Sequence, residues 1–186
     1  LTMGAGEAFI AGGCESMSRV PMMGFNPAPN PVFDQELTGD ILGQGPTAER
    51  VAAQFGVDRQ TQDQFALASH QKARAAQAAG RLDGEIAPLK VGEAVISADG
   101  CIRETSLDKL RDLRAAFVEN GSVTAGNSSP MTDGASALLV CTEAFAKRHN
   151  LDLLARIESF AVAGCDPAIM RMGPVAASRE AMARAK

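Results

Sequence analysis

A largely apolar run at residues 135–141, with Ser136 as its one polar residue, constrains the fold of this chain more than any other feature. The turn residues Thr132, Asp133 and Gly134 come directly before it. A run of this length bounded by turn residues is typical of a strand that is buried on both faces, as in a parallel sheet. The sequence therefore predicts an internal strand of an α/β protein at this position.

The loop before this strand, residues 124–129, contains only small and short polar side chains. We expect it to lie at the entrance to the sheet with exposed N–H groups, an arrangement that lets a polar ligand approach closely. A tight, hydroxyl-rich turn has the same composition. Both interpretations stand on these residues alone.

Strand and helix patterns alternate along the rest of the chain. Residues 7–13 predict a strand, and residues 14–45 contain four prolines and little periodicity. Residues 47–55 place apolar side chains on one helical face. Asp58 is a suitable N-cap for a second helix, with Gly80 as its C-terminal stop.

The remaining patterns predict an α-rich middle and a strand-helix alternation near the end. Weak strands are expected at residues 86–91 and 94–96, and a helical stripe joins Leu107, Leu110, Leu113 and Phe117. Thr142 caps a helix to about His149, residues 156–163 predict a strand, and residues 175–186 predict a helix. This alternation favours a parallel α/β architecture.

Composition excludes several classes of protein. Hydrophobic residues make up 46% and charged residues 22%, a globular balance. No apolar run approaches the roughly 20 residues of a membrane span. A net charge of −4, without Trp or Tyr, argues against nucleic-acid binding. The four cysteines form no metal-binding pattern, and free thiols without a signal peptide indicate the cytoplasm.

Both ends of the chain look cut. Leu1 opens the sequence in what reads as the tail of a helix, and helical spacing still continues at Lys186 without a Gly or Pro cap. We therefore expect an internal piece of a longer protein.

Composition and spacing alone identify no active site. His70 falls within a helix and His149 near a helix end, and neither has a nucleophile at a recognisable spacing. Arg103, Arg111 and Arg114 form a basic cluster that could hold a phosphate, but a solvated helix face has the same pattern.

Five segments of the chain nevertheless resemble the thiolase family, specifically the central part of a 3-ketoacyl-CoA thiolase (acetyl-CoA acyltransferase). They read IAGGCESMSRVPM, TAERVAAQFGVDRQTQDQFALASHQKA, LRAAF, VTAGNSSPMTDGASALL and GCDPAIMRMGP, at residues 10–22, 47–73, 113–117, 123–139 and 164–174. They occur in the order found in the family and span nearly the whole chain.

The resemblance implies a layered αβαβα thiolase fold, present as an internal fragment with an α-rich loop-domain insertion. Residues 1–13 would end the N-terminal half and residues 14–132 would form the loop domain over the substrate. Residues 133–150 would be the last strand and helix of the N-terminal half, and residues 151–186 would begin the C-terminal half.

The chemistry implied is thiolysis of a 3-ketoacyl-CoA by coenzyme A, or the reverse Claisen condensation, through an acyl-cysteine. The family's catalytic segments find no match in these 186 residues, so the fragment alone would be inactive. The alternative is a non-catalytic CoA-binding or assembly module derived from a thiolase. Coenzyme A would be a substrate, with no bound cofactor and no metal. The family also implies a homodimer or homotetramer and acyl-CoA as partner. The positions around Gln44 lack the His-Met pair of acetoacetyl-CoA-specific members, which favours a degradative role in fatty acid β-oxidation.

The resemblance transfers CoA binding to several residues. Ser129, with Ser128, stands where the family hydrogen-bonds the pantetheine amide. Arg103 aligns with the residue that meets the CoA phosphates, where a guanidinium suits phosphate oxygens. Phe117 and Met170 occupy positions that line the CoA and acyl channel.

Three departures from the family pattern affect this site. Gln44 stands where Met is usual, which predicts a more polar acyl pocket. Arg171 replaces the customary Gly after Met170 and puts a bulky cation beside the channel. One residue, normally Pro, is missing between Arg103 and Glu104, which affects the alignment of Arg103.

Overall fold

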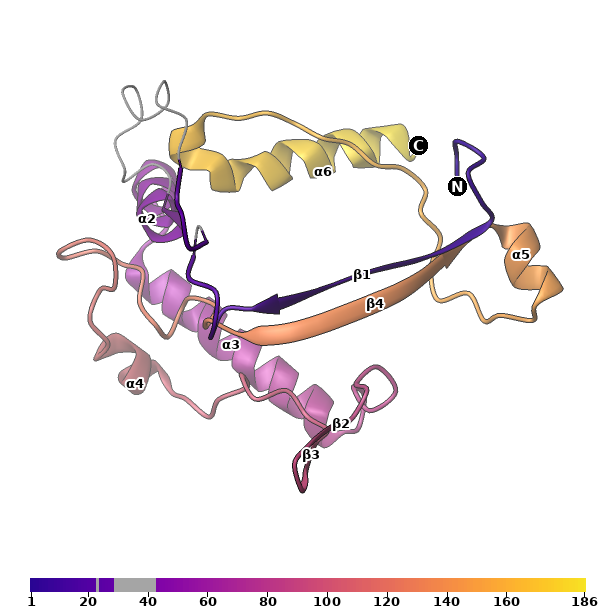
Figure 1. Cartoon of the computed structure of the whole chain (residues 1–186). Coiled ribbons are helices and arrows are strands. Elements are labelled where there is room, and N and C mark those ends of the chain that lie inside the picture. The colour runs from indigo at the N-terminus through magenta and orange to yellow at the C-terminus, as the bar shows by residue number, and fades with distance from the viewer. Residues whose placement is uncertain (23, 29–42) are drawn as a thin grey trace. The chain divides into compact units, whose positions relative to one another are not determined.

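The computed structural model describes residues 1–22, 24–28 and 43–186 and divides the chain into two compact units. The first, which we call the strand unit, contains Leu1–Pro29, Met131–Gly164 and Pro174–Lys186. The second, the helical unit, contains Asn30–Pro130 and Cys165–Gly173. Both consist of segments that are distant in sequence (Figure 1). Part of the proline-containing stretch predicted to be irregular, residues 14–45, lies outside the described residues.

Strands β1 (Ala8–Ser16) and β4 (Asp133–Cys141) form the sheet of the strand unit. They pair antiparallel along their whole length, from Ala8 opposite Cys141 to Ser16 opposite Asp133 (Figure 1). Both strands were predicted, but the parallel arrangement expected for residues 135–141 is wrong. A continuous apolar run reports burial and says nothing about the direction of the partner strand.

The expected burial of this strand on both faces is also absent. Ile10 on β1 is 81% exposed and Leu138 on β4 is 67% exposed. The physical reason is that, over the residues that the structure describes, the sheet has two strands, so each strand has one neighbour and little covers its faces. The sequence pattern of a core strand is therefore present without the core.

Polar contacts fasten both ends of the β1–β4 pair. At one end the N–H of Thr142 donates to the carbonyl oxygen of Glu7 at 2.8 Å, and the guanidinium of Arg148 pairs with the Glu7 carboxylate at 2.6 Å. At the other end the backbone N–H and the hydroxyl of Ser18 donate to the Asp133 carboxylate at 2.9 and 2.5 Å. These contacts join the residues that flank β1 to β4 and to the residues that follow it, at both ends of the strand pair.

Two helices complete the strand unit as predicted. Helix α5 (Glu143–Arg148) begins after Thr142, whose hydroxyl oxygen accepts the N–H of Phe145 at 3.2 Å. Helix α6 spans Gly173–Arg184.

The strand predicted for residues 156–163 does not form. The hydroxyl of Ser159 instead donates to the carbonyl of Ala181 at 2.6 Å, and Arg184 donates to the carbonyl of Phe160 at 3.0 Å. The segment therefore bonds to α6, and no strand in the described ranges pairs with it.

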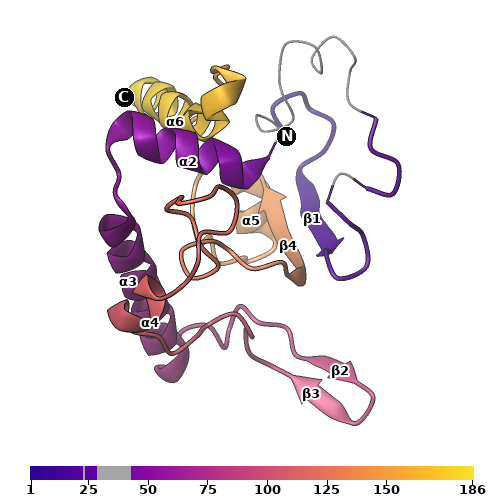
Figure 2. The same cartoon turned by 90° about the vertical axis from the view of Figure 1, so that its left-hand side faces the viewer.

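Helices α2 (Gln44–Phe55) and α3 (Arg59–Ala78) dominate the helical unit (Figure 2). Asp58 caps α3 as predicted, since its carboxylate accepts the N–H of Thr61 at 2.7 Å. Gly80, just after α3, has φ +66° and ends the helix in the left-handed conformation that favours glycine. The predicted weak strands form a hairpin, β2 (Leu89–Val91) and β3 (Ala94–Ile96).

The third predicted helix is much shorter than its apolar stripe. Helix α4 (Leu107–Arg111) ends before Leu113, and the following residues form an extended loop with an isolated bridge between Ala115 and Thr124. The reason is that the chain after α4 takes other hydrogen-bond partners: the N–H of Ala116 donates to the carbonyl oxygen of Val123 at 2.9 Å and not to a residue one helical turn earlier. A short 3-10 helix, η2 (Pro167–Met172), completes the unit.

No helix of the described residues is both long and apolar enough to cross a membrane.

Candidate functional site

The small-residue loop at residues 122–130 is held in place by side chains of α2 and α3. The Glu49 carboxylate, on α2, accepts the N–H of Ser122 at 2.9 Å, its hydroxyl at 2.8 Å and the N–H of Val123 at 2.7 Å. Burial raises the pKa of Glu49, but these hydrogen bonds outweigh it, and the pKa lies below its ordinary value. The charged form of Glu49 therefore fixes the start of the loop.

Asn127 fixes the centre of the loop. Its side-chain oxygen accepts the N–H of Thr124 at 2.7 Å, and its amide nitrogen donates to the carbonyl of Ser122 at 3.0 Å. The same nitrogen donates to the Asp63 carboxylate on α3 at 3.1 Å. Thr124 is fully buried at 0% exposure, so its N–H has no access to water and needs this partner.

Asp63 connects the loop to Arg59 and, through it, to α4. Asp63 is 4% exposed and accepts the Arg59 Nε–H at 2.8 Å. The Nη2 of Arg59 donates to the carbonyl oxygens of Leu110 at 2.5 Å and Leu113 at 3.2 Å. A cation at this position satisfies carbonyls that the end of a helix leaves unpaired. We refer to Glu49, Arg59, Asp63, Ser122 and Asn127 as the loop network.

Gly126 lies where the loop passes closest to the end of α4. A Cβ atom at this position would lie 2.5 Å from a methyl group of Leu110 and 2.6 Å from one of Leu113. Only glycine fits without displacing these side chains. The position of the loop beside Leu110 and Leu113 therefore requires glycine at residue 126.

The network places Ser128 at a cavity of about 140 Å³. Arg103 and His70 line the same cavity, and the Arg103 backbone N–H donates to His70 Nδ1 at 3.2 Å. The structure thus brings together two of the predicted site residues, Arg103 and Ser128. Ser129 is exposed beside the cavity and does not line it. The complete lining is His70, Cys101, Arg103, Thr105, Leu110, Leu113, Ala125, Gly126, Ser128 and Pro130.

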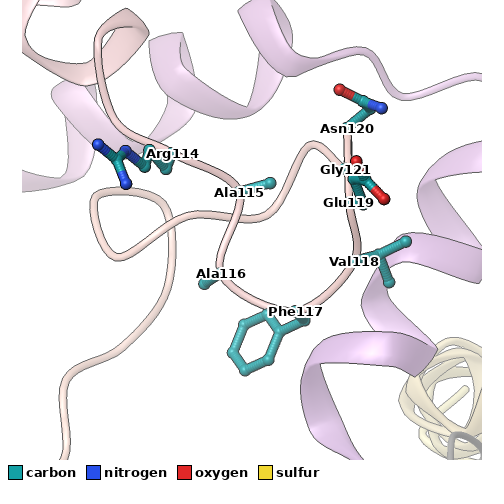
Figure 3. A pocket seen from close by; sticks show the side chains of 8 residues that line it. All are labelled: Arg114, Ala115, Ala116, Phe117, Val118, Glu119, Asn120 and Gly121. Carbon is teal, nitrogen blue, oxygen red and sulfur yellow. The ribbon is translucent and has the colours of Figure 1, made fainter.

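The other predicted residues gather at the start of α2. Phe117 borders an open hollow of about 530 Å³ formed by residues 114–121 (Figure 3). The Phe117 ring lies so close to Gly45 that a Cβ atom on Gly45 would overlap with the ring. Gln44 directly precedes Gly45. Arg171, next to Met170 on η2, donates to the Gln44 carbonyl through Nε at 3.0 Å and Nη2 at 2.9 Å. Gln44, Phe117 and Met170 therefore form a second group, distinct from Arg103 and Ser128.

Sequence reasoning missed the loop network. Glu49 and Asp63 lie on helices whose polar faces look like ordinary solvated surface, so nothing local marks them as loop anchors. Asn127 gives the one usable signal, because an Asn among Ser, Thr and Gly often bonds the backbone of its own turn. Within the described ranges, no group of three His, Cys, Asp or Glu side chains is placed to hold a metal ion.

Comparison with known proteins gives a consistent set of relatives. Residues 1–144 match the family described as thiolase, N-terminal domain. The acetyl-CoA acetyltransferase of Paracoccus denitrificans is 41% identical over 98% of this chain and 51% of its own length. The 3-ketoacyl-CoA thiolase of Shewanella loihica is 45% identical over 98% of this chain and 49% of its own length.

Solved structures agree with these relatives. Human mitochondrial 3-ketoacyl-CoA thiolase superposes with a TM-score of 0.81 and 35% identity over 98% of this chain and 50% of that chain. The same human protein in complex with CoA gives a TM-score of 0.80. The chain spans about half the length of the relatives that it matches.

Replacing Asn127 tests the loop network. Asn127→Ala leaves the buried Thr124 N–H and one oxygen of Asp63 without their partner, which should lower the free energy of unfolding by about 1–3 kcal/mol. Urea denaturation followed by far-ultraviolet circular dichroism measures this. Ser129→Ala, two residues along the same loop and exposed, should change it by less than about 0.5 kcal/mol. Equal effects of the two substitutions on the free energy of unfolding would contradict the stabilising role of the loop network.

The low pKa of Glu49 predicts a pH-dependent contribution to stability. Because the folded-state pKa lies below the unfolded value of 4.5, the contribution is complete above that value and is lost as pH falls through the folded-state pKa. Glu49→Gln should therefore be less stable than the wild type at neutral pH, and the difference should shrink on acidification. Denaturation at a series of pH values measures it, with exposed Glu85→Gln as the control. A difference independent of pH would show that the carboxylate charge is not the cause.

Proposed function

The chain belongs to the thiolase family, and we propose that it is the CoA-binding part of an acyltransferase that cleaves 3-ketoacyl-CoA with coenzyme A. The same enzyme would run the reverse Claisen condensation. The observation that carries the proposal is that relatives with these names match nearly the whole chain, and that one neighbour of the same fold is a CoA complex. The α/β architecture is that of part of a thiolase.

The reaction proceeds in two acyl-transfer steps. A cysteine thiolate attacks the 3-keto carbon of the substrate, the bond between C2 and C3 breaks, and acetyl-CoA leaves after protonation of its C2 carbanion. The shortened acyl group stays on the cysteine as a thioester. The thiol of a second CoA then loses its proton, attacks this thioester and releases acyl-CoA with the free cysteine. We propose that sequence outside these 186 residues supplies the cysteine and its acid–base partners, and we assign no catalytic role to the four cysteines present.

This chain contributes the binding surface for CoA. The exposed Arg103 guanidinium would meet the nucleotide phosphates, and the small hydroxyls of Ser128 and Ser129 would bond the pantetheine amide. The shared cavity of Arg103 and Ser128 supports placing these two contacts on one ligand. Gln44, Phe117 and Met170 would border the acyl group, consistent with their gathering at the start of α2.

The family also suggests how this chain is organised within the larger protein. We propose that residues 14–132 form the loop domain, between residues 1–13 and 133–150 of the N-terminal half, with the C-terminal half beginning at residue 151. Further strands would cover the exposed apolar faces of β1 and β4, where Ile10 and Leu138 now meet solvent. We further propose a cytoplasmic homodimer or homotetramer that degrades fatty acyl chains.

Kinetics of the full-length protein that contains this chain test the proposal. The wild type should thiolyse acetoacetyl-CoA or a longer 3-ketoacyl-CoA. Ser129→Ala should raise KM for CoA about 3- to 10-fold, as expected for one neutral hydrogen bond, and Arg103→Ala about 10- to 100-fold for a charged one. Ser97→Ala, exposed after β3, should leave KM unchanged.

The outcomes separate the two candidate functions. Absence of thiolysis together with retained CoA binding would exclude the acyltransferase and favour a non-catalytic CoA-binding or assembly module. An unchanged KM in both Ser129→Ala and Arg103→Ala would exclude the proposed binding surface.

A further inference from the structure

The two positions where this chain departs from the family's acyl pocket, Gln44 and Arg171, contact each other. They are 127 residues apart, and both lie in the helical unit. The Nε and Nη2 groups of Arg171 donate to the Gln44 carbonyl oxygen at 3.0 and 2.9 Å. The contact uses the backbone of Gln44, so it orients the guanidinium independently of the Gln44 side chain.

The Gln44 carbonyl is itself held in position by a hydrogen bond. The Thr47 hydroxyl, fully buried, donates to it at 3.0 Å and to the Gly43 carbonyl at 2.9 Å. The next residue, Gly45, is in contact with the Phe117 ring, where a Cβ atom would overlap with it. Arg171 is therefore anchored to the first turn of α2, next to Gly45, on which Phe117 packs.

The anchoring leaves half of the guanidinium available. A guanidinium carries five N–H donors, and the contact to Gln44 uses the edge formed by Nε and Nη2. The opposite edge, one N–H from each terminal nitrogen, has the spacing of the two oxygens of a carboxylate. Among the described residues no hydrogen bond or ion pair occupies that edge, and the side chain is exposed.

No carboxylate in the part of the chain that the structure describes compensates the charge of Arg171. Its acceptor is a neutral carbonyl, and no carboxylate of the described residues lies within ion-pair distance of it. Many other arginines of the described chain are paired, among them Arg59 with Asp63, Arg74 with Glu104 and Arg148 with Glu7. An anchored, unpaired guanidinium attracts an anion and penalises an apolar group that would strip its water.

We propose that Arg171 is a specificity-determining residue that selects 3-ketoacyl-CoA substrates whose acyl chain ends in a carboxylate. The free edge of the guanidinium bonds the distal carboxylate with two parallel N–H···O contacts, while the Gln44 carbonyl holds the other edge. A chain ending in a methyl group gains neither contact and must displace water from the cation. This inference rests on the proposed thiolase activity and specifies its substrate class.

Paired substrates of equal length test the inference in the full-length protein. One 3-ketoacyl-CoA ends in a carboxylate and the other in a methyl group, and kcat/KM for thiolysis is measured for both. The wild type should prefer the carboxylate, and Arg171→Gly, which introduces the residue usual in the family, should reduce that preference about 10- to 100-fold, the range for loss of charge-assisted contacts. Arg171→Lys should retain part of the preference, because it keeps the charge without the planar fork.

Controls separate recognition from general damage. Arg50→Ala removes an exposed cation from α2, the helix that Arg171 contacts, and should leave the preference unchanged. The ratio between the two substrates cancels any loss of folded enzyme, so a partly unfolded variant still reports on recognition. Raising the salt concentration should weaken the preference of the wild type for the exposed charge.

Each result decides one claim. Equal loss of both substrates in Arg171→Gly, or a wild type that prefers the methyl-ended substrate, would overturn the role of Arg171 and leave the thiolase activity intact. A wild type that turns over neither substrate would overturn the proposed activity, and with it this inference.

Discussion

The hydrogen bonds between Asn127, Asp63 and the Thr124 N–H are the constraint on which the helical unit depends. Asp63 and Thr124 are buried, so breaking their contacts leaves polar groups without water or partner. Through Arg59 the same contacts reach the carbonyls at the end of α4, and beside them Glu49 holds the loop to α2. One network thus positions three helices and the small-residue loop. This loop supplies part of the lining of the cavity shared by Arg103 and Ser128.

The proposed substrate surface consists of two groups of residues, and different contacts hold each group in place. Arg103 and Ser128 lie at the cavity beside α3 and α4, where polar contacts and the absence of a Cβ at Gly126 define the space. Gln44, Phe117 and Met170 lie near the first turn of α2, held by Arg171 and by the packing of Phe117 on Gly45. This separation suits a long ligand with a charged head and an acyl end, because a substitution at one group of residues leaves the contacts of the other group unchanged. Two of the three departures from the family pattern, Gln44 and Arg171, belong to the acyl end, and the third, the missing residue after Arg103, belongs to the phosphate end.

Local signals predicted most elements, and tertiary contacts explain the failures. The caps Asp58 and Thr142 and the helix stop at Gly80 act within a few residues, so the sequence alone identified them. The helical stripe through Phe117 was misleading because the residues after α4 pair with a later part of the chain, Ala115 with Thr124, instead of continuing the helix. The direction of β4 depended on its pairing with β1, which no pattern within residues 135–141 contains. Residue chemistry likewise suggested a ligand loop but could not identify Glu49 and Asp63, which act from other elements.

Hydrogen exchange of the full-length protein, with and without CoA, tests the central claim most directly. The claim is that the loop held by Asn127 and Asp63 is a CoA-binding surface. Added CoA should slow exchange of the amides of Ala125 and residues 127–129, while Val123 and Thr124, already bonded within the protein, should change little. Protection that appears only elsewhere in the protein, with these amides unaffected at saturating CoA, would contradict the account.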